Sequence, residues 1–125
     1  MARVLLECGN ALVTMDRVEG LRAAGHEVTT CSGPSHHDCP VLAGRSCGAV
    51  DDADVVVSCL GDKTLRVALA TKLQHADRPV VAMLADSDVN GVAPLVDGVV
   101  IVPLGVGDLA LAATVQRCLD EGSAS

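Results

Sequence analysis

Short apolar runs alternate along this chain with longer stretches in which apolar residues recur about once per helical turn. The runs predict five β-strands, and the longer stretches predict helices with one apolar face. The predicted strands cover residues 3–7, 27–31, 54–60, 79–85 and 99–104. The predicted helices cover residues 14–24, 64–76 and 108–119, with one or two further helical turns at 92–96. Strands that alternate with helices predict a doubly wound α/β fold, in which helices cover both faces of one parallel sheet.

The apolar positions of the first two long helices predict the face that each one buries. The inward residues are expected to be Met15, Val18, Leu21 and Ala24 in one helix and Leu65, Ala68, Leu69 and Leu73 in the other. Thr14 is a candidate N-cap of the first helix, and Gly25 can adopt a left-handed backbone at its end. The polar stretch 32–52 predicts a long loop or a distorted short helix.

Composition and charge exclude several classes of function. The 125 residues are 50% hydrophobic, and 16 acidic against 9 basic residues give a net charge of −7. A negative protein repels phosphate backbones, and the chain has no Phe, Tyr or Trp on which bases could stack, so no nucleic acid is expected as a partner. The apolar runs are broken well before the ~20 residues of a membrane helix, and no signal peptide is recognisable, which predicts a cytoplasmic protein without a membrane partner. One domain is expected over residues 1–120, followed by a short flexible tail at 121–125.

Two local stretches and the order of the predicted units carry a resemblance to a known family. One stretch is residues 21–28, with the sequence LRAAGHEV, and the other is residues 99–104 followed by Asp108 and Leu109. Together with the unit order they resemble the receiver domain of two-component response regulators, over nearly the whole chain. The resemblance implies a flavodoxin-like, five-stranded sheet of order 2-1-3-4-5, with ligand chemistry at the carboxyl ends of strands 1 and 3.

The residues that carry receiver chemistry are missing at the matching positions. Receivers hold magnesium with an acidic pair after strand 1, accept phosphate on an Asp after strand 3, and use a hydroxyl after strand 4 and a Lys before a proline in strand 5. The matching positions here are Cys8 and Gly9, Cys59, Leu84 or Ala85, and Val102 before Pro103. Receiver-type phosphorylation is therefore not expected. We expect a non-enzymatic regulatory or interaction module that binds a protein partner or a second copy of itself, because receivers often dimerise through helix 4, strand 5 and helix 5.

Six cysteines in a protein predicted to be cytoplasmic lead to a second hypothesis. In the implied strand order, the carboxyl ends of strands 2, 1 and 3 lie side by side and carry Cys31, Cys8 and Cys59. The loop after the second strand adds His36, His37, Cys39 and Cys47. Such ligands suit zinc, copper(I) or an iron–sulfur cluster, and thiols also form reversible disulfides. The alternative function is therefore a metal-binding or redox-responsive protein, although the spacing matches no known metal motif.

The same residues also have simpler interpretations. Cysteine is among the most buried residue types, so Cys8 and Cys59 can be small core residues, and Cys118 on the last helix is assigned to that role. Histidines in loops are usually solvated, which is the expectation for His26 and His75.

Two weaker patterns point to other chemistry. Asp86, Asp88, Asn90 and Asp97 follow the spacing of a calcium-binding loop, but the flanking residues do not predict the helix pair of an EF-hand. Cys8 before a helix is similar to the phosphocysteine loop of sugar phosphotransferase IIB domains, which makes a phosphocysteine-type transfer domain the third hypothesis. The sequence places no acid, base and nucleophile together in the cleft, so an enzyme is less expected than a non-enzymatic module.

Overall fold

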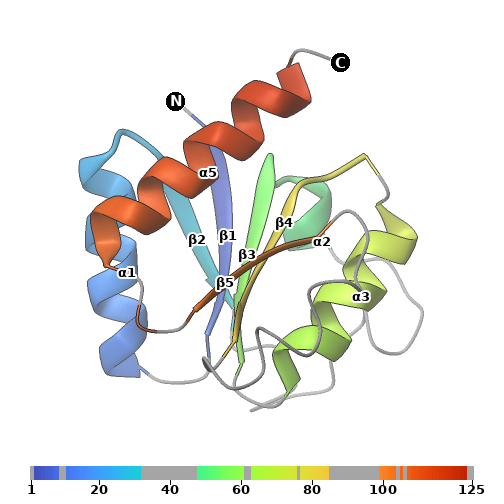
Figure 1. Ribbon diagram of the computed structural model, residues 1–125, viewed down its shortest axis with the longest axis horizontal. Coiled ribbons are helices and arrows are strands. Elements are labelled where there is room, and N and C mark those ends of the chain that lie inside the picture. The colour runs from blue at the N-terminus through green and yellow to red at the C-terminus, as the bar shows by residue number, and fades with distance from the viewer. Residues whose placement is uncertain are drawn as a thin grey trace.

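The computed structural model describes residues 2–8, 11–31, 48–60, 63–75, 77–84, 99–103, 105 and 107–123. Its elements are, in chain order, β1 (Arg3–Cys8), α1 (Ala11–Ala23), β2 (Glu27–Cys31), α2 (Gly48–Asp51), β3 (Val55–Cys59), α3 (Thr64–Gln74), β4 (Val80–Leu84), β5 (Val99–Pro103) and α5 (Asp108–Ser123). The strands form one parallel sheet of order β2-β1-β3-β4-β5. Figure 1 shows α1 and α5 on one side of the sheet and α2 and α3 on the other. The predicted doubly wound fold and its strand order are confirmed.

Side chains that alternate along the strands build two separate cores, one on each side of the sheet. The α1–α5 core includes Val4, Leu6, Cys8, Val18, Leu21, Val55, Val57, Cys59, Met83, Leu111 and Val115. The α3 core includes Leu5, Val50, Ala53, Val56, Ala68, Val80, Ala82 and Val99. β3 and β4 are buried over their whole length. This explains their unbroken apolar sequence, since both faces of a central parallel strand are covered.

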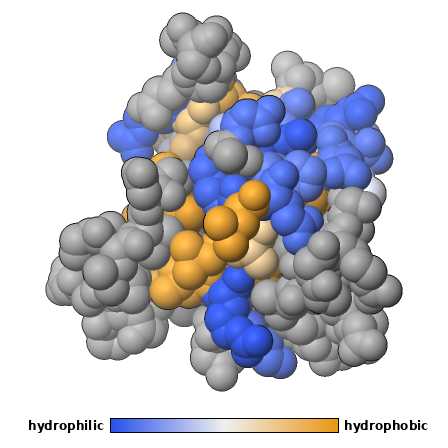
Figure 2. Space-filling model, turned by 90° about the vertical axis from the view of Figure 1, so that its right-hand side faces the viewer, coloured by the Kyte–Doolittle hydropathy of each residue, from blue (hydrophilic) through white to orange (hydrophobic). Residues whose placement is uncertain are grey.

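α3 buries a different face from the one predicted. Its buried residues are Thr64, Val67, Ala68 and Thr71. Leu73 is 86% exposed and Leu69 is 39% exposed, so their predicted inward position is wrong. The Leu60 backbone N–H donates to Thr64 Oγ1 over 2.6 Å, and Thr71 Oγ1 donates to a carbonyl of its own helix over 2.9 Å. Because these hydroxyls are hydrogen bonded, burying them carries little penalty. Figure 2, which views this side, shows apolar surface bordered by hydrophilic atoms.

The first and last helices are longer than predicted. α1 begins at Ala11, so Thr14 lies within the helix and is not its N-cap. Val18 and Leu21 are buried as predicted, whereas Met15 is 61% exposed. Gly25 has a φ of 92°, the left-handed conformation predicted for the end of this helix. α5 continues to Ser123, into the stretch predicted as a tail. None of the described helices is long and apolar enough to span a membrane.

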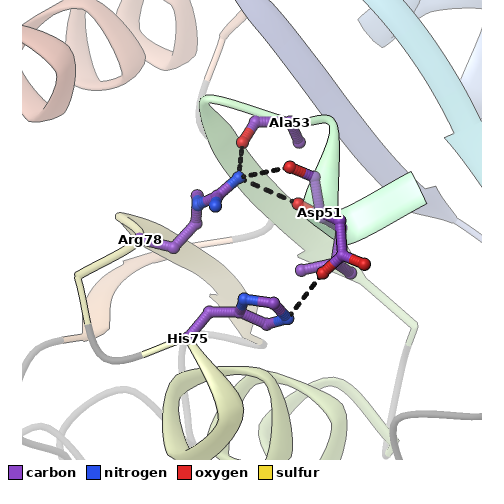
Figure 3. A network of polar contacts seen from close by, with 5 residues as sticks. Asp51, Ala53, His75 and Arg78 are labelled. Carbon is purple, nitrogen blue, oxygen red and sulfur yellow. Dashed lines mark hydrogen bonds and ion pairs between the residues drawn. The ribbon is translucent and has the colours of Figure 1, made fainter. Parts of the chain in front are cut away.

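At the amino ends of the strands, Arg78 connects the α3–β4 turn to the turn between α2 and β3 by hydrogen bonds (Figure 3). Its Nη1 donates to the carbonyls of Val50 over 3.0 Å and Asp51 over 3.1 Å, at the end of α2, and to the carbonyl of Ala53. His75, directly after α3, lies 3.2 Å from the Asp51 carboxylate. The last carbonyls of a helix have no hydrogen-bond donor within the helix. At the end of α2, Arg78 from the α3–β4 turn acts as a donor to these carbonyls.

The two histidines in the described part of the chain are not solvated, contrary to the prediction. His26 is 6% exposed, and neither ring nitrogen has a hydrogen-bond partner among the described residues. The His75 side chain is 17% exposed. Both lie between a helix and the next strand, His26 between α1 and β2 and His75 between α3 and β4.

Candidate functional site at the carboxyl edge of the sheet

The register of β1 against β3 brings together two cysteines that are far apart in the sequence. Cys8 and Cys59 end these neighbouring strands and are register partners. Both belong to the α1–α5 core and are 6% and 8% exposed. The two thiols are hydrogen bonded to each other. The structure thus joins two of the three strand-end cysteines that the sequence placed side by side.

Burial controls the ionisation of Cys59. It raises the pKa of Cys59 to about 11, and the neighbouring Cys8 thiol adds to the shift. The Arg17 guanidinium on α1 acts in the opposite direction. Because the thiolate is the reactive nucleophile and metal ligand, Cys59 is unreactive at neutral pH unless a cation stabilises its charged form.

Cys31 does not join this pair. It ends β2 as the register partner of Glu7, and it packs against the α3 core. Glu7 directly precedes Cys8, and successive side chains of a strand point to opposite faces of the sheet. The three strand-end thiols are therefore divided between the two sides of the sheet.

Glu7 is a buried carboxyl group that the sequence analysis did not single out. It is 2% exposed, and burial raises its pKa from 4.5 to about 7, while the hydroxyl of Ser58, its register partner on β3, opposes part of the shift. Its Oε1 atom has no hydrogen-bond partner among the described residues. The sequence held one signal: Glu7 is two residues after Leu5, on the same face of a strand whose residues 4–8 are buried.

Several predicted ligands fall outside the described residues. These are the predicted thiol-site ligands His36, His37, Cys39 and Cys47 and the residues of the calcium pattern, Asp86, Asp88, Asn90 and Asp97. Within the described ranges, no group of three or more His, Cys, Asp or Glu residues could hold a metal ion. Cys118 is 6% exposed in the α1–α5 core, as its assignment to packing predicts.

A cavity of about 620 Å³ lies at the opposite, amino edge of the sheet and is lined by several aspartates. Two of these aspartate carboxylates already have a polar partner. Asp54 accepts a hydrogen bond from the Arg3 backbone N–H over 2.8 Å, and Asp51 lies beside His75. The turns that Arg78 connects line part of this cavity, and residues of α5 line another part.

Comparison with solved structures identifies the fold of this chain. No family model matches the chain, and no curated protein matches it. Among solved structures, it is similar to a response regulator receiver domain protein from Clostridium thermocellum, with 15% identity, 98% of each chain covered and a TM-score of 0.77. The chain has a receiver fold. A response regulator receiver protein from Sinorhizobium medicae shows 19% identity over 97% of this chain and 96% of its own, with a TM-score of 0.72.

A third similar structure is described as a transiently phosphorylated switch in bacterial signal transduction. It has 20% identity, covers 98% of this chain and 97% of its own, and has a TM-score of 0.74. Within the receiver fold of the present chain, Cys8 and Cys59 lie at the carboxyl ends of the two adjacent strands β1 and β3. That is the edge at which doubly wound sheets bind ligands.

Proposed function

We propose that this chain is a receiver-like regulatory module that associates with a protein partner or with a second copy of itself, without an acyl-phosphate switch. The observation that carries the proposal is the chemistry at the ends of β1 and β3. The resemblance implies carboxylates there, and this chain has the buried thiols Cys8 and Cys59. Sulfur ligands do not suit magnesium, which prefers oxygen ligands, and without an aspartate no acyl phosphate forms.

Radiolabelled acetyl phosphate with magnesium is expected to leave the wild-type chain unlabelled, because no described strand end offers both a carboxylate acceptor and a magnesium cage. The measurement is the label retained after denaturing electrophoresis, with an ordinary receiver as the positive control. A hydroxylamine-sensitive label on the chain would contradict the proposal. A label released by iodine would point instead to phosphocysteine, an outcome that the burial of Cys8 does not favour.

The surface formed by β5 and α5 is the first place to test association, since the resemblance implies a dimer face there. Leu109 in the first turn of α5 is 90% exposed. Leu109→Asp is expected to weaken self-association at least about tenfold, because the loss of one buried leucine contact costs at least ~1.4 kcal/mol. Sedimentation over a concentration series measures this, and Leu73→Asp on α3 is the matched control. Equal weakening by both variants, or a wild-type monomer throughout, would exclude self-association through this face.

A second candidate function, a thiol-based input, is favoured by the pairing of Cys8 with Cys59. Two cysteines 51 positions apart become register partners and share a hydrogen bond. Such a pair can bind a soft metal ion or form a reversible disulfide with a disulfide oxidant such as oxidised glutathione. In the oxidation, two protein thiols and one glutathione disulfide give one protein disulfide and two glutathione thiols. This input is compatible with an associating receiver-like module.

A further inference from the structure

We propose that Cys8, Cys59 and Met83, brought together in the α1–α5 core at the carboxyl edge of the sheet, form a binding site for one copper(I) ion. The inference rests on the second candidate function, the thiol-based input, and names its ligand. It does not depend on how the module associates.

The three sulfur atoms come from three consecutive strands of the sheet. Cys8 on β1 and Cys59 on β3 are register partners. Ser58 on β3 is in register with Ala82 on β4, so the residues one step further along these strands are Cys59 and Met83. All three side chains belong to the α1–α5 core, and Met83 is 0% exposed. The site therefore contains two thiols and a thioether in one buried cluster.

The spacing of the strands is compatible with a bridging metal ion. Neighbouring strands lie about 4.8 Å apart. Metal–thiolate bonds are about 2.3 Å long, so two thiolates on opposite sides of one ion are about 4.6 Å apart. The strand spacing also lies within the Cα–Cα range of a disulfide, about 4.4–6.8 Å, so a bridging ion and a disulfide are alternative states of the Cys8–Cys59 pair.

The donor set selects the kind of ion. Thiolate and thioether ligands are soft and favour copper(I), whereas structural zinc and iron–sulfur clusters take four ligands, chiefly thiolates and imidazoles. The described residues offer no group of three or more His, Cys, Asp or Glu ligands. Copper(I) is stable with two thiolates and a weak third donor, which matches what Cys8, Cys59 and Met83 provide.

The protein also offers positive charge near the negatively charged copper–dithiolate complex. One copper(I) ion displaces one proton from each thiol, so the product carries a single negative charge and two protons leave to solvent. Arg17 on α1 already lowers the pKa of Cys59, and it would face this negative charge. α1 begins close after Cys8, which places the positive end of the helix dipole at the same edge. The low exposure of both thiols would also keep water from the ion.

The test is an anaerobic titration of the reduced full chain with the coloured bicinchoninate complex of copper(I). We expect the chain to withdraw one equivalent of copper(I). Cys8→Ser and Cys59→Ser are each expected to lower the affinity at least about a hundredfold, since changes in the surroundings of ligands alone cost about ten- to a hundredfold. Met83→Leu is expected to lower it less, and affinity is expected to rise with pH because two protons are released. Cys31→Ser, at a strand end on the opposite side of the sheet, is the matched control and is expected to bind as wild type.

X-ray absorption at the copper edge of the wild-type complex tests the site even if a serine variant fails to fold. A first shell of two or three sulfur atoms supports the site, and a shell of nitrogen or oxygen overturns it. Uptake that survives both serine substitutions, or loss of all copper to the chelator, also overturns it. If no copper is retained but oxidised glutathione links Cys8 to Cys59, the copper inference fails and the thiol-based input stands. If the chain neither retains copper nor forms the disulfide, the copper inference and the thiol-based input are both wrong.

Discussion

Glu7→Gln is expected to stabilise the protein by about 3 kcal/mol at pH 8 and to change its stability little at pH 4. Burial raises the pKa of Glu7 from 4.5 to about 7, because the charged carboxylate is poorly solvated inside the sheet. At pH 8 the native state has to hold that charge, whereas the unfolded state exposes it to water. Glutamine keeps the size of the side chain and removes this cost.

The direction of the pH dependence follows from proton uptake. Between pH 4.5 and about 7 the native state binds more protons at Glu7 than the unfolded state does, so the free energy of unfolding falls as pH rises through this window. The stabilising contribution is complete below pH 4.5 and is lost above about pH 7. A shift of this size corresponds to about 3 kcal/mol.

Urea unfolding at a series of pH values measures this effect, followed by far-ultraviolet circular dichroism because the chain lacks aromatic residues. The wild-type protein should lose stability across the window, and Glu7→Gln should not. Glu27→Gln, at an exposed position that begins β2, is the matched control and should follow the wild type. Parallel pH profiles for Glu7→Gln and the wild type would show that Glu7 is not the titrating group.

Arg78→Ala is expected to destabilise the protein by about 2–3 kcal/mol. The substitution removes a charged donor from the carbonyls of Val50, Asp51 and Ala53. Hydrogen bonds from charged groups contribute more than neutral ones. The Val50 carbonyl also accepts from the Ala53 backbone N–H over 3.1 Å, so a desolvation cost is expected only at the carbonyls of Asp51 and Ala53. The same substitution releases the α3–β4 turn from the end of α2.

The control for Arg78→Ala is Arg66→Ala, an exposed arginine on α3, which is expected to change stability by less than about 0.5 kcal/mol. Urea midpoints of both variants at one pH provide the comparison. Arg78→Lys should recover part of the loss, because it retains a cation with several donors but lacks the reach of the guanidinium. If the urea midpoint of Arg78→Ala equals that of Arg66→Ala, the connection between the turns contributes no net stability.

The central strands β3 and β4 were predictable because both of their faces are buried. Val55, Val56 and Val57 in succession suit only a strand covered on both faces, and such a strand belongs in the middle of a parallel sheet. Gly25 likewise marked a helix end that the structure confirms. These signals are local, so the sequence alone contains them.

The helix faces and the site were less predictable because they depend on contacts between distant segments. On α3, hydrogen bonds make Thr64 and Thr71 acceptable in the core, and no hydropathy pattern reports those bonds. Cys31, Cys8 and Cys59 all end strands, but only the alternation of side chains in the actual register assigns Cys31 to the other side. The burial of Glu7 and His26 also depends on the layers packed above them.

Adjacent residues of β1 place a carboxyl group in one core and a thiol in the other. Glu7 faces the side of α3, and Cys8 faces the side of α1 and α5. A deletion of one residue ahead of Glu7 in β1 would exchange the two faces, placing the carboxylate opposite Val57 and the thiol opposite Ser58. The length of this strand is therefore under a stricter constraint than the identity of its apolar residues: conservative replacements at Val4 or Leu6 preserve both environments, and a change in length preserves neither.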